Sequence, residues 1–160
     1  MSLFRGLGVD ISRAENDLSQ IIERCPELNF TPLKVKSAWV EPEDEFTKPG
    51  VMYTGEYRIV NPLNNEVIDG GHPVSTNYKP HDVKAILQSL CEIATLGDLT
   101  LSNAAVLRDG EHIVLQASSK SSFSPVVGDI YGGNVLFKIS NVPGITSSVS
   151  AYVLRLVCTN

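Results

Sequence analysis

Residues 83–117 read VKAILQSLCEIATLGDLTLSNAAVLRDGEHIVLQA, and this part of the sequence carries the strongest secondary-structure signals. Its first part places apolar residues at helical spacing, which predicts an amphipathic helix over 83–96. Pro80 and Asp82 suit the first turn of this helix, and Gly97 suits its end. Segments 99–107 and 112–117 then flank Arg108-Asp109-Gly110-Glu111, and Asp-Gly readily adopts the positive φ angles of a hairpin turn. We therefore expect a hairpin over 99–117 whose apolar residues pack beneath the helix.

Beyond the hairpin, the polar stretch 118–124 is expected to interrupt the sheet. Two further strands are predicted over 134–140 and 147–158, joined through Pro143-Gly144. The last strand ends without a covering element, and an open strand edge presents unpaired backbone groups. We therefore expect the chain to form a homo-oligomer.

Upstream of the helix the sequence predicts a second, shorter helix and several strands. Ser12 and Glu15 form a capping-box pattern, followed by apolar residues at helical spacing until Pro26. Strands are predicted over 33–40 and 51–60, and a short one at 67–68 that pairs as a hairpin with its neighbour. The acidic, proline-flanked residues Glu41, Glu43, Asp44 and Glu45 indicate a solvated loop between the first two strands.

Together these elements predict an α+β fold. We expect one mainly antiparallel sheet of about six to eight strands, with two main helices packed on one of its faces. The sequence shows no internal repeat and no long linker, so residues 1–160 are expected to form a single domain.

Composition narrows the function classes. The chain has 13 basic and 18 acidic residues, so its net charge of −5 disfavours nucleic acid except through a local basic patch. No apolar run is long enough to cross a bilayer and the first residues lack a secretory pattern, so we expect a cytoplasmic protein with no membrane partner. Cys25, Cys91 and Cys158 are odd in number and widely spaced, and are expected to be free thiols.

No residue pattern indicates catalysis, a cofactor or a metal. Gly6-Leu7-Gly8 lacks the third glycine of a dinucleotide fingerprint, and His72, His81 and His112 lack metal-ligand spacing. The aspartates near glycines, Asp69 among them, are explained by turn chemistry. We expect no cofactor, no metal and no enzymatic activity.

Two groups of residues could contact nucleic acid. Lys120 and Phe123 lie in a serine-rich stretch that offers a cation and an aromatic ring beside small hydrogen-bond donors. Lys34 and Lys36 alternate with Val35 and Trp39 and so share one strand face, and Tyr53 and Tyr57 share a face of the next strand. Packing is the competing interpretation of the tyrosines, and a plain hydrophilic loop that of the serine-rich stretch.

Four short phrases carry a family resemblance: Arg5-Gly6-Leu7-Gly8-Val9-Asp10, Tyr78-Lys79-Pro80, Gly128-Asp129 and the closing Arg155-Leu156-Val157-Cys158-Thr159-Asn160. Through them the chain resembles the uncharacterised phage/plasmid-like protein family known as domain of unknown function 932. Members of that family are typically longer, so the resemblance implies that this chain is a fragment such as their N-terminal part, an engineered form or a natural short form. The resemblance supplies no catalytic residues and implies a role in mobile DNA.

Two functions remain open at this point. The first is a nonenzymatic accessory role in phage or plasmid DNA metabolism, as a single-stranded DNA binding or annealing protein that uses Lys34, Lys36, Lys120, Tyr53, Tyr57 and Phe123. The alternative is a protein-binding module that acts against a host defence system or in phage assembly, for which an acidic surface is suited.

Overall fold

The computed structural model describes residues 8–40, 51–124 and 130–157. It contains two α-helices and eight strands in two antiparallel sheets, which confirms the α+β class. The strands divide between two sheets, a separation that the sequence did not predict. The helices are α1 (Leu18–Arg24) and α2 (Val83–Leu96). The strands are β1 (Val9–Asp10), β2 (Leu33–Val40), β3 (Val51–Asn61), β4 (Glu66–Val67), β5 (Leu99–Leu107), β6 (His112–Phe123), β7 (Ile130–Ser140) and β8 (Ser148–Val157).

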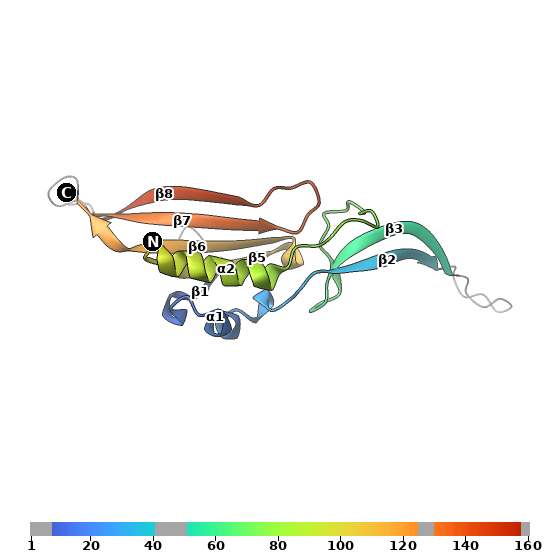
Figure 1. Ribbon diagram of the computed structural model, residues 1–160, viewed down its shortest axis with the longest axis horizontal. Helices are drawn as coiled ribbons and strands as arrows, with labels where there is room; N and C mark the ends of the chain where they lie inside the picture. The colour runs from blue at the N-terminus through green and yellow to red at the C-terminus, as the bar shows by residue number, and fades with distance from the viewer. Residues whose placement is uncertain (1–7, 41–50, 125–129, 158–160) are drawn as a thin grey trace.

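The larger sheet has the order β1-β5-β6-β7-β8 and forms the body of the molecule. Both helices lie on the same side of this sheet, as Figure 1 shows. The smaller sheet, β2-β3-β4, extends from one end of the body, and β2 and β3 form a projecting two-stranded arm. Along the chain, the arm follows α1 and the short 3-10 turn Pro26–Leu28.

The predicted helix and hairpin at 83–117 are confirmed. Asp82 is the N-cap of α2, and its side chain accepts a hydrogen bond from the Ala85 backbone N–H at 3.1 Å. Leu87 and Leu90 on α2 pack in one apolar cluster with Leu101 on β5 and Leu115 on β6. The helix therefore covers the hairpin as its apolar stripe predicts.

The turn of this hairpin is built from left-handed residues. Arg108, Asp109 and Gly110 have φ angles of 49°, 59° and 114°. A Cβ at Gly110 would lie 2.9 Å from the Phe30 ring and 3.1 Å from the Asn61 side chain. Glycine is thus required by both backbone conformation and close packing.

The start of the first helix was predicted wrongly. Ser12 begins only a short 3-10 turn, Ser12–Ala14, and Glu15 and Asn16 then take left-handed conformations with φ of 51° and 62°. The helix proper starts at Leu18, and its N-cap is Asp17, which accepts from the Gln20 N–H at 2.9 Å. The predicted capping box fails because Glu15 lies outside the helix.

The polar stretch after residue 117 does not interrupt the sheet. Strand β6 continues to Phe123, with Ser118 opposite Thr100 on β5 and Ser122 opposite Gly132 on β7. Ser118 and Ser119 pair with β5, while Ser122 and Phe123 pair with β7 after a register shift, so backbone pairing keeps this polar stretch in the sheet. For the same reason β7 begins at Ile130, four residues before the predicted start at Asn134.

Candidate nucleic-acid interface

The arm presents two different faces. In its register Lys36 lies opposite Tyr57 and Ala38 opposite Tyr53, while Trp39 lies opposite Met52. Because side chains alternate along a strand, the two lysines and two tyrosines share one face and Trp39 and Met52 belong to the other. The structure thus confirms both predicted alternations and adds that the lysines and tyrosines lie together. Lys34, Lys36, Tyr53 and Tyr57 are called the lysine–tyrosine face below.

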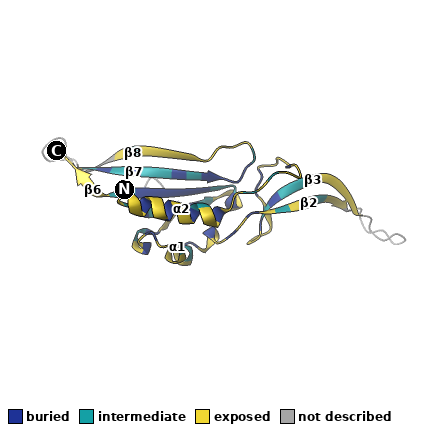
Figure 2. Cartoon of the chain, in the orientation of Figure 1, coloured by how far each residue is buried: buried dark blue, intermediate teal, exposed yellow. Residues whose placement is uncertain are grey.

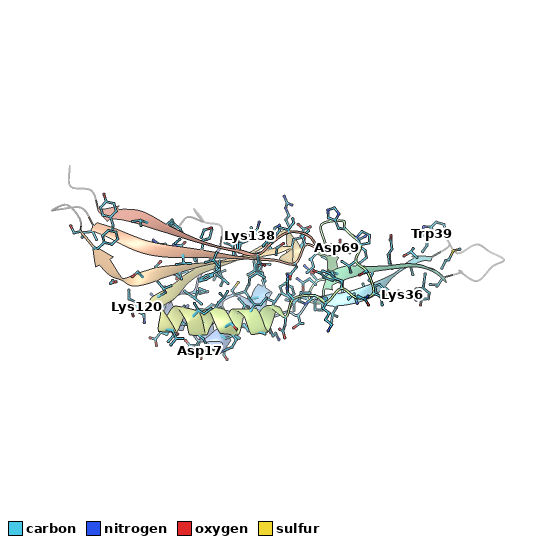
Figure 3. The ribbon with its side chains drawn as sticks, turned by 45° about the horizontal axis from the view of Figure 1, so that its top comes forward. Asp17, Lys36, Trp39, Asp69, Lys120 and Lys138 are labelled. Carbon is cyan, nitrogen blue, oxygen red and sulfur yellow. The ribbon has the colours of Figure 1, made fainter. Side chains whose placement is uncertain are left out.

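Each lysine on this face lies over a tyrosine of the neighbouring strand. The Lys36 Nζ is 4.4 Å from the centre of the Tyr53 ring, and the Lys34 Nζ is 5.1 Å from that of Tyr57. Such cation–π pairs contribute about 0.5–1 kcal/mol at exposed positions. They place the ammonium groups next to the rings along β2 and β3, and Figure 3 labels Lys36 on the arm.

The two lysines differ in how available they are. Lys34 donates hydrogen bonds to the backbone carbonyls of Thr76 and, at 2.9 Å, Tyr78, so its ammonium ties the arm to the segment before α2. Lys36 is exposed, as is Tyr53, with 60% of its surface accessible. Lys36 and Tyr53 are therefore the residues of this face that a ligand can reach most readily.

The opposite face of the arm is open and mostly apolar, with Arg58 opposite Val35 as a cation at its base. By the alternation along β2 and β3 it carries Leu33, Val35, Trp39 and Met52, which are 50%, 39%, 61% and 65% exposed. Figure 2 shows that exposed residues run along the outer part of the arm. We call these four residues the apolar arm face. Trp39 and Met52 were missed in the prediction of binding residues, although a tryptophan in a strand beside a charged loop could have indicated an exposed contact.

A buried ion pair fixes the base of the arm. The Arg58 guanidinium on β3 binds the Asp69 carboxylate through two hydrogen bonds of 2.6 and 2.7 Å. The Asp69 side chain is fully buried and also accepts from the backbone N–H groups of Ile59 and Gly71. Burial alone raises the pKa of this carboxyl, but these hydrogen bonds and the charge of Arg58 outweigh it and hold the pKa below its ordinary value of 3.8. Asp69 does stand in a turn, as predicted, and it also anchors the arm.

The structure does not bring Lys120 and Phe123 to the arm. Both lie on β6 in the larger sheet, and Figure 3 shows Lys120 at the end of the molecule far from Lys36. The Lys120 Nζ lies 3.6 Å from an Asp98 carboxylate oxygen, and Phe123 stacks on Tyr131 with ring centres 5.7 Å apart. The six predicted binding residues therefore form two separate groups. Composition could not show this separation because it depends on which strands share a sheet.

The described cysteines and metal-ligating side chains do not form a reactive site. Cys25 and Cys91 are free and buried. Burial raises the pKa of both thiols, that of Cys91 to about 11. No group of three or more metal-ligating side chains occurs within residues 8–40, 51–124 and 130–157. Cys158 and the acidic residues Glu41 to Glu45 lie outside the described residues.

None of the helices in the described part of the chain combines the length and the apolar character that a membrane-spanning helix needs.

Comparisons with known proteins returned no match. No family model matches the chain, no curated protein matches its sequence and no solved structure matches its fold. The resemblance to the phage/plasmid-like family thus rests on the short phrases quoted above.

Proposed function

We propose that this chain is a nonenzymatic accessory protein of phage or plasmid DNA metabolism, acting in the host cytoplasm, that binds single-stranded DNA along the lysine–tyrosine face. The observation that carries the proposal is the position of the Lys36 ammonium 4.4 Å above the exposed Tyr53 ring. A cation beside an aromatic ring matches the alternating phosphates and bases of a single strand. The family resemblance supports the setting in mobile DNA.

The described strands of the arm carry more cations than acids, whereas the sequence between them, residues 41–50, carries four acids and Lys48. The described arm residues, 33–40 and 51–61, include the cations Lys34, Lys36 and Arg58 and the single acid Glu56. Arg58 is neutralised by Asp69, and the chain as a whole carries −5. A few phosphate contacts against a repulsive overall field give weak, salt-sensitive binding, in the range of about 10⁻⁴ to 10⁻⁶ M that is usual for nonspecific DNA contacts.

Binding would exchange one contact of Lys36 for another. In the free protein its ammonium covers one face of the Tyr53 ring. The long lysine side chain can turn toward a phosphate, which exposes the ring for a base to stack on it. Lys34 would not take part in this exchange, because its ammonium remains hydrogen-bonded to the carbonyls of Thr76 and Tyr78.

The proposal predicts separable effects of Lys36→Ala and Tyr53→Ala on oligothymidylate binding measured by fluorescence anisotropy at several salt concentrations. Lys36→Ala should reduce the slope of log affinity against log salt by about 0.7 to 1, because one fewer phosphate contact releases fewer counterions. Tyr53→Ala should weaken binding by about 1–3 kcal/mol with little change of slope, because stacking releases no counterions.

Lys120→Ala is the matched control, since it removes the same charge from the other sheet and should leave affinity and slope close to those of the parent. Absence of binding at low salt would contradict the proposal. So would a loss in Lys120→Ala as large as that in Lys36→Ala.

A second candidate function, binding of a protein partner, is favoured by the apolar arm face. Trp39 and Met52 form a cross-strand pair that is more than half exposed, and tryptophan and methionine are enriched in protein interfaces. This face is separate from the lysine–tyrosine face, so the two candidates can be tested independently.

For this candidate, a photo-crosslinking residue at position 52 should form adducts with a protein partner in host cells, and the same residue at position 53 should not. Residues 52 and 53 are neighbours on opposite faces and are similarly exposed. Trp39→Glu should abolish the adducts at position 52. Equal labelling from both positions, or adducts that persist in Trp39→Glu, would rule out a specific interface on this face.

A further inference from the structure

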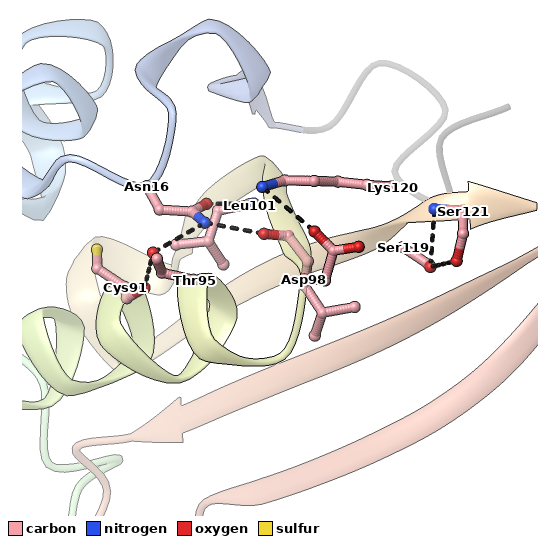
Figure 4. Close-up of polar contacts among 9 residues, drawn as sticks. Asn16, Cys91, Thr95, Asp98, Leu101, Ser119, Lys120 and Ser121 are labelled. Carbon is pink, nitrogen blue, oxygen red and sulfur yellow. Dashed lines mark hydrogen bonds and ion pairs between the residues drawn. The ribbon is translucent and has the colours of Figure 1, made fainter.

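The two edges of the larger sheet differ in how far their backbone groups are hydrogen-bonded. On the β5 edge, the Asn16 side chain donates to the Leu99 carbonyl at 2.8 Å and accepts from the Leu101 N–H at 2.8 Å (Figure 4). The Ile11 N–H donates to the Ser102 carbonyl at 3.0 Å. Strand β1 then pairs with the next two residues of β5. The N-terminal segment thus forms hydrogen bonds with the backbone of β5 along most of this edge.

The β8 edge has no such cover among the described residues. Strand β8 is the last of the sheet order and pairs only with β7. Residues 148–154 contain no charge and no proline, which are the usual protections of an edge strand against pairing. Residues 148–151 and 153 are exposed.

Strand β8 also exposes apolar side chains on the side where the helices lie. Val149 pairs with Phe137, a member of the core cluster beneath the helices, so Val149 and Val153 point to that same side. They are nevertheless 65% and 56% exposed. In Figure 1 the helices lie on the side of β5 and β6, and neither helix covers β8.

We propose that β8 pairs with β8 of a second copy of the chain, antiparallel about a two-fold axis at Ala151. In this register Ala151 faces its own counterpart and Val149 faces the partner subunit's Val153. A strand that pairs with its own copy about a two-fold axis must place compatible side chains opposite one another. Residues 149–153 do so, because the facing side chains on the helix side are all apolar. A shift by one position of the axis, to Tyr152, would instead place Val149 opposite the partner subunit's Arg155.

The resulting assembly is one continuous ten-stranded sheet, which is within the size of open sheets. A single pair of strands buries less than the roughly 1,000 Å² of a stable interface. The dimer should therefore form reversibly and dissociate on dilution.

Sedimentation velocity with charge-swapped variants tests this proposal. The parent should shift from the mass of one chain to that of two as its concentration rises. Ala151→Lys and Ala151→Glu should each remain monomeric, because either change places two like charges face to face across the axis. An equimolar mixture of the two variants should recover the dimer, because the charges across the axis are then opposite. This recovery also shows that both variants are folded.

Leu96→Lys is the control, since Leu96 is 89% exposed at the end of α2, away from β8. It should dimerise like the parent. A parent that stays monomeric at every concentration would overturn the proposal. A dimer that survives in Ala151→Lys, or variants that do not recover on mixing, would overturn it as well, because the interface would then lie elsewhere.

Discussion

Replacement of Leu90 by aspartate is expected to lower the free energy of unfolding by at least about 4 kcal/mol. Leu90 belongs to α2 and is 8% exposed. Its side chain packs in the same cluster as Leu101 and Leu115 of the β5–β6 hairpin. A carboxylate at this position would lose the apolar contacts of leucine and would have no described cation beside it. Since a domain of this size is stable by only about 5–15 kcal/mol, the variant should lose roughly a quarter or more of its free energy of unfolding.

The measurement is urea unfolding followed by circular dichroism, with Ile93→Asp and Leu96→Asp as controls in the same helix. These residues are 53% and 89% exposed, so their replacement should cost less than about 1 kcal/mol. A Leu90→Asp variant as stable as the controls would show that α2 does not cover the hairpin as described.

Asp69→Asn should produce the second large effect. The Asp69 carboxylate binds Arg58 through two hydrogen bonds and is fully buried, so an amide would leave the guanidinium without its counter-charge. Removing one partner of a buried pair costs about 3–5 kcal/mol, and the lower end applies because Arg58 is 30% exposed. Asp109→Asn is the control, since Asp109 lies in an exposed turn.

The pH dependence of this effect has a definite sign. The pKa of Asp69 in the folded protein lies below its ordinary value of 3.8, so the ionised carboxylate stabilises the fold at every pH above that value. The stabilisation is lost as the pH falls through the lowered pKa. The stability difference between the parent and Asp69→Asn should therefore be largest near neutral pH and should shrink in acid. A difference that is constant down to strongly acidic pH would contradict the role of the ion pair.

Local patterns in the sequence were sufficient for most elements of the fold. Helix α2 and the strands β2, β3 and β5 follow from apolar periodicity, since a regular element must turn its apolar side chains toward the core. Two predictions failed where distant residues decide the local structure. Glu15 and Asn16 leave the helical conformation at the point where Asn16 reaches the backbone of β5. Strand β6 continues through Ser118 to Phe123 because β5 pairs with it as far as Ser119 and β7 pairs with Ser122 and Phe123.

The candidate site was predicted only in part. The lysines and tyrosines of the arm could be found because alternation assigns them to strand faces, but composition could not place Lys120 and Phe123 in the other sheet. The buried state of Asp69 also depends on a distant partner, Arg58. Residues whose role is set by strand order and tertiary pairing have no signature within a short window of sequence.

Single-stranded DNA is expected to bind the lysine–tyrosine face, and mapping of amide chemical shifts by NMR would detect this binding residue by residue. On titration of ¹⁵N-labelled protein with oligothymidylate at low salt, shifts should move for the amides of β2 and β3 around Lys36 and Tyr53. The amides around Lys120 and Phe123 on β6 should stay in place. Changes confined to the larger sheet, or no change at saturating oligonucleotide, would contradict the claim.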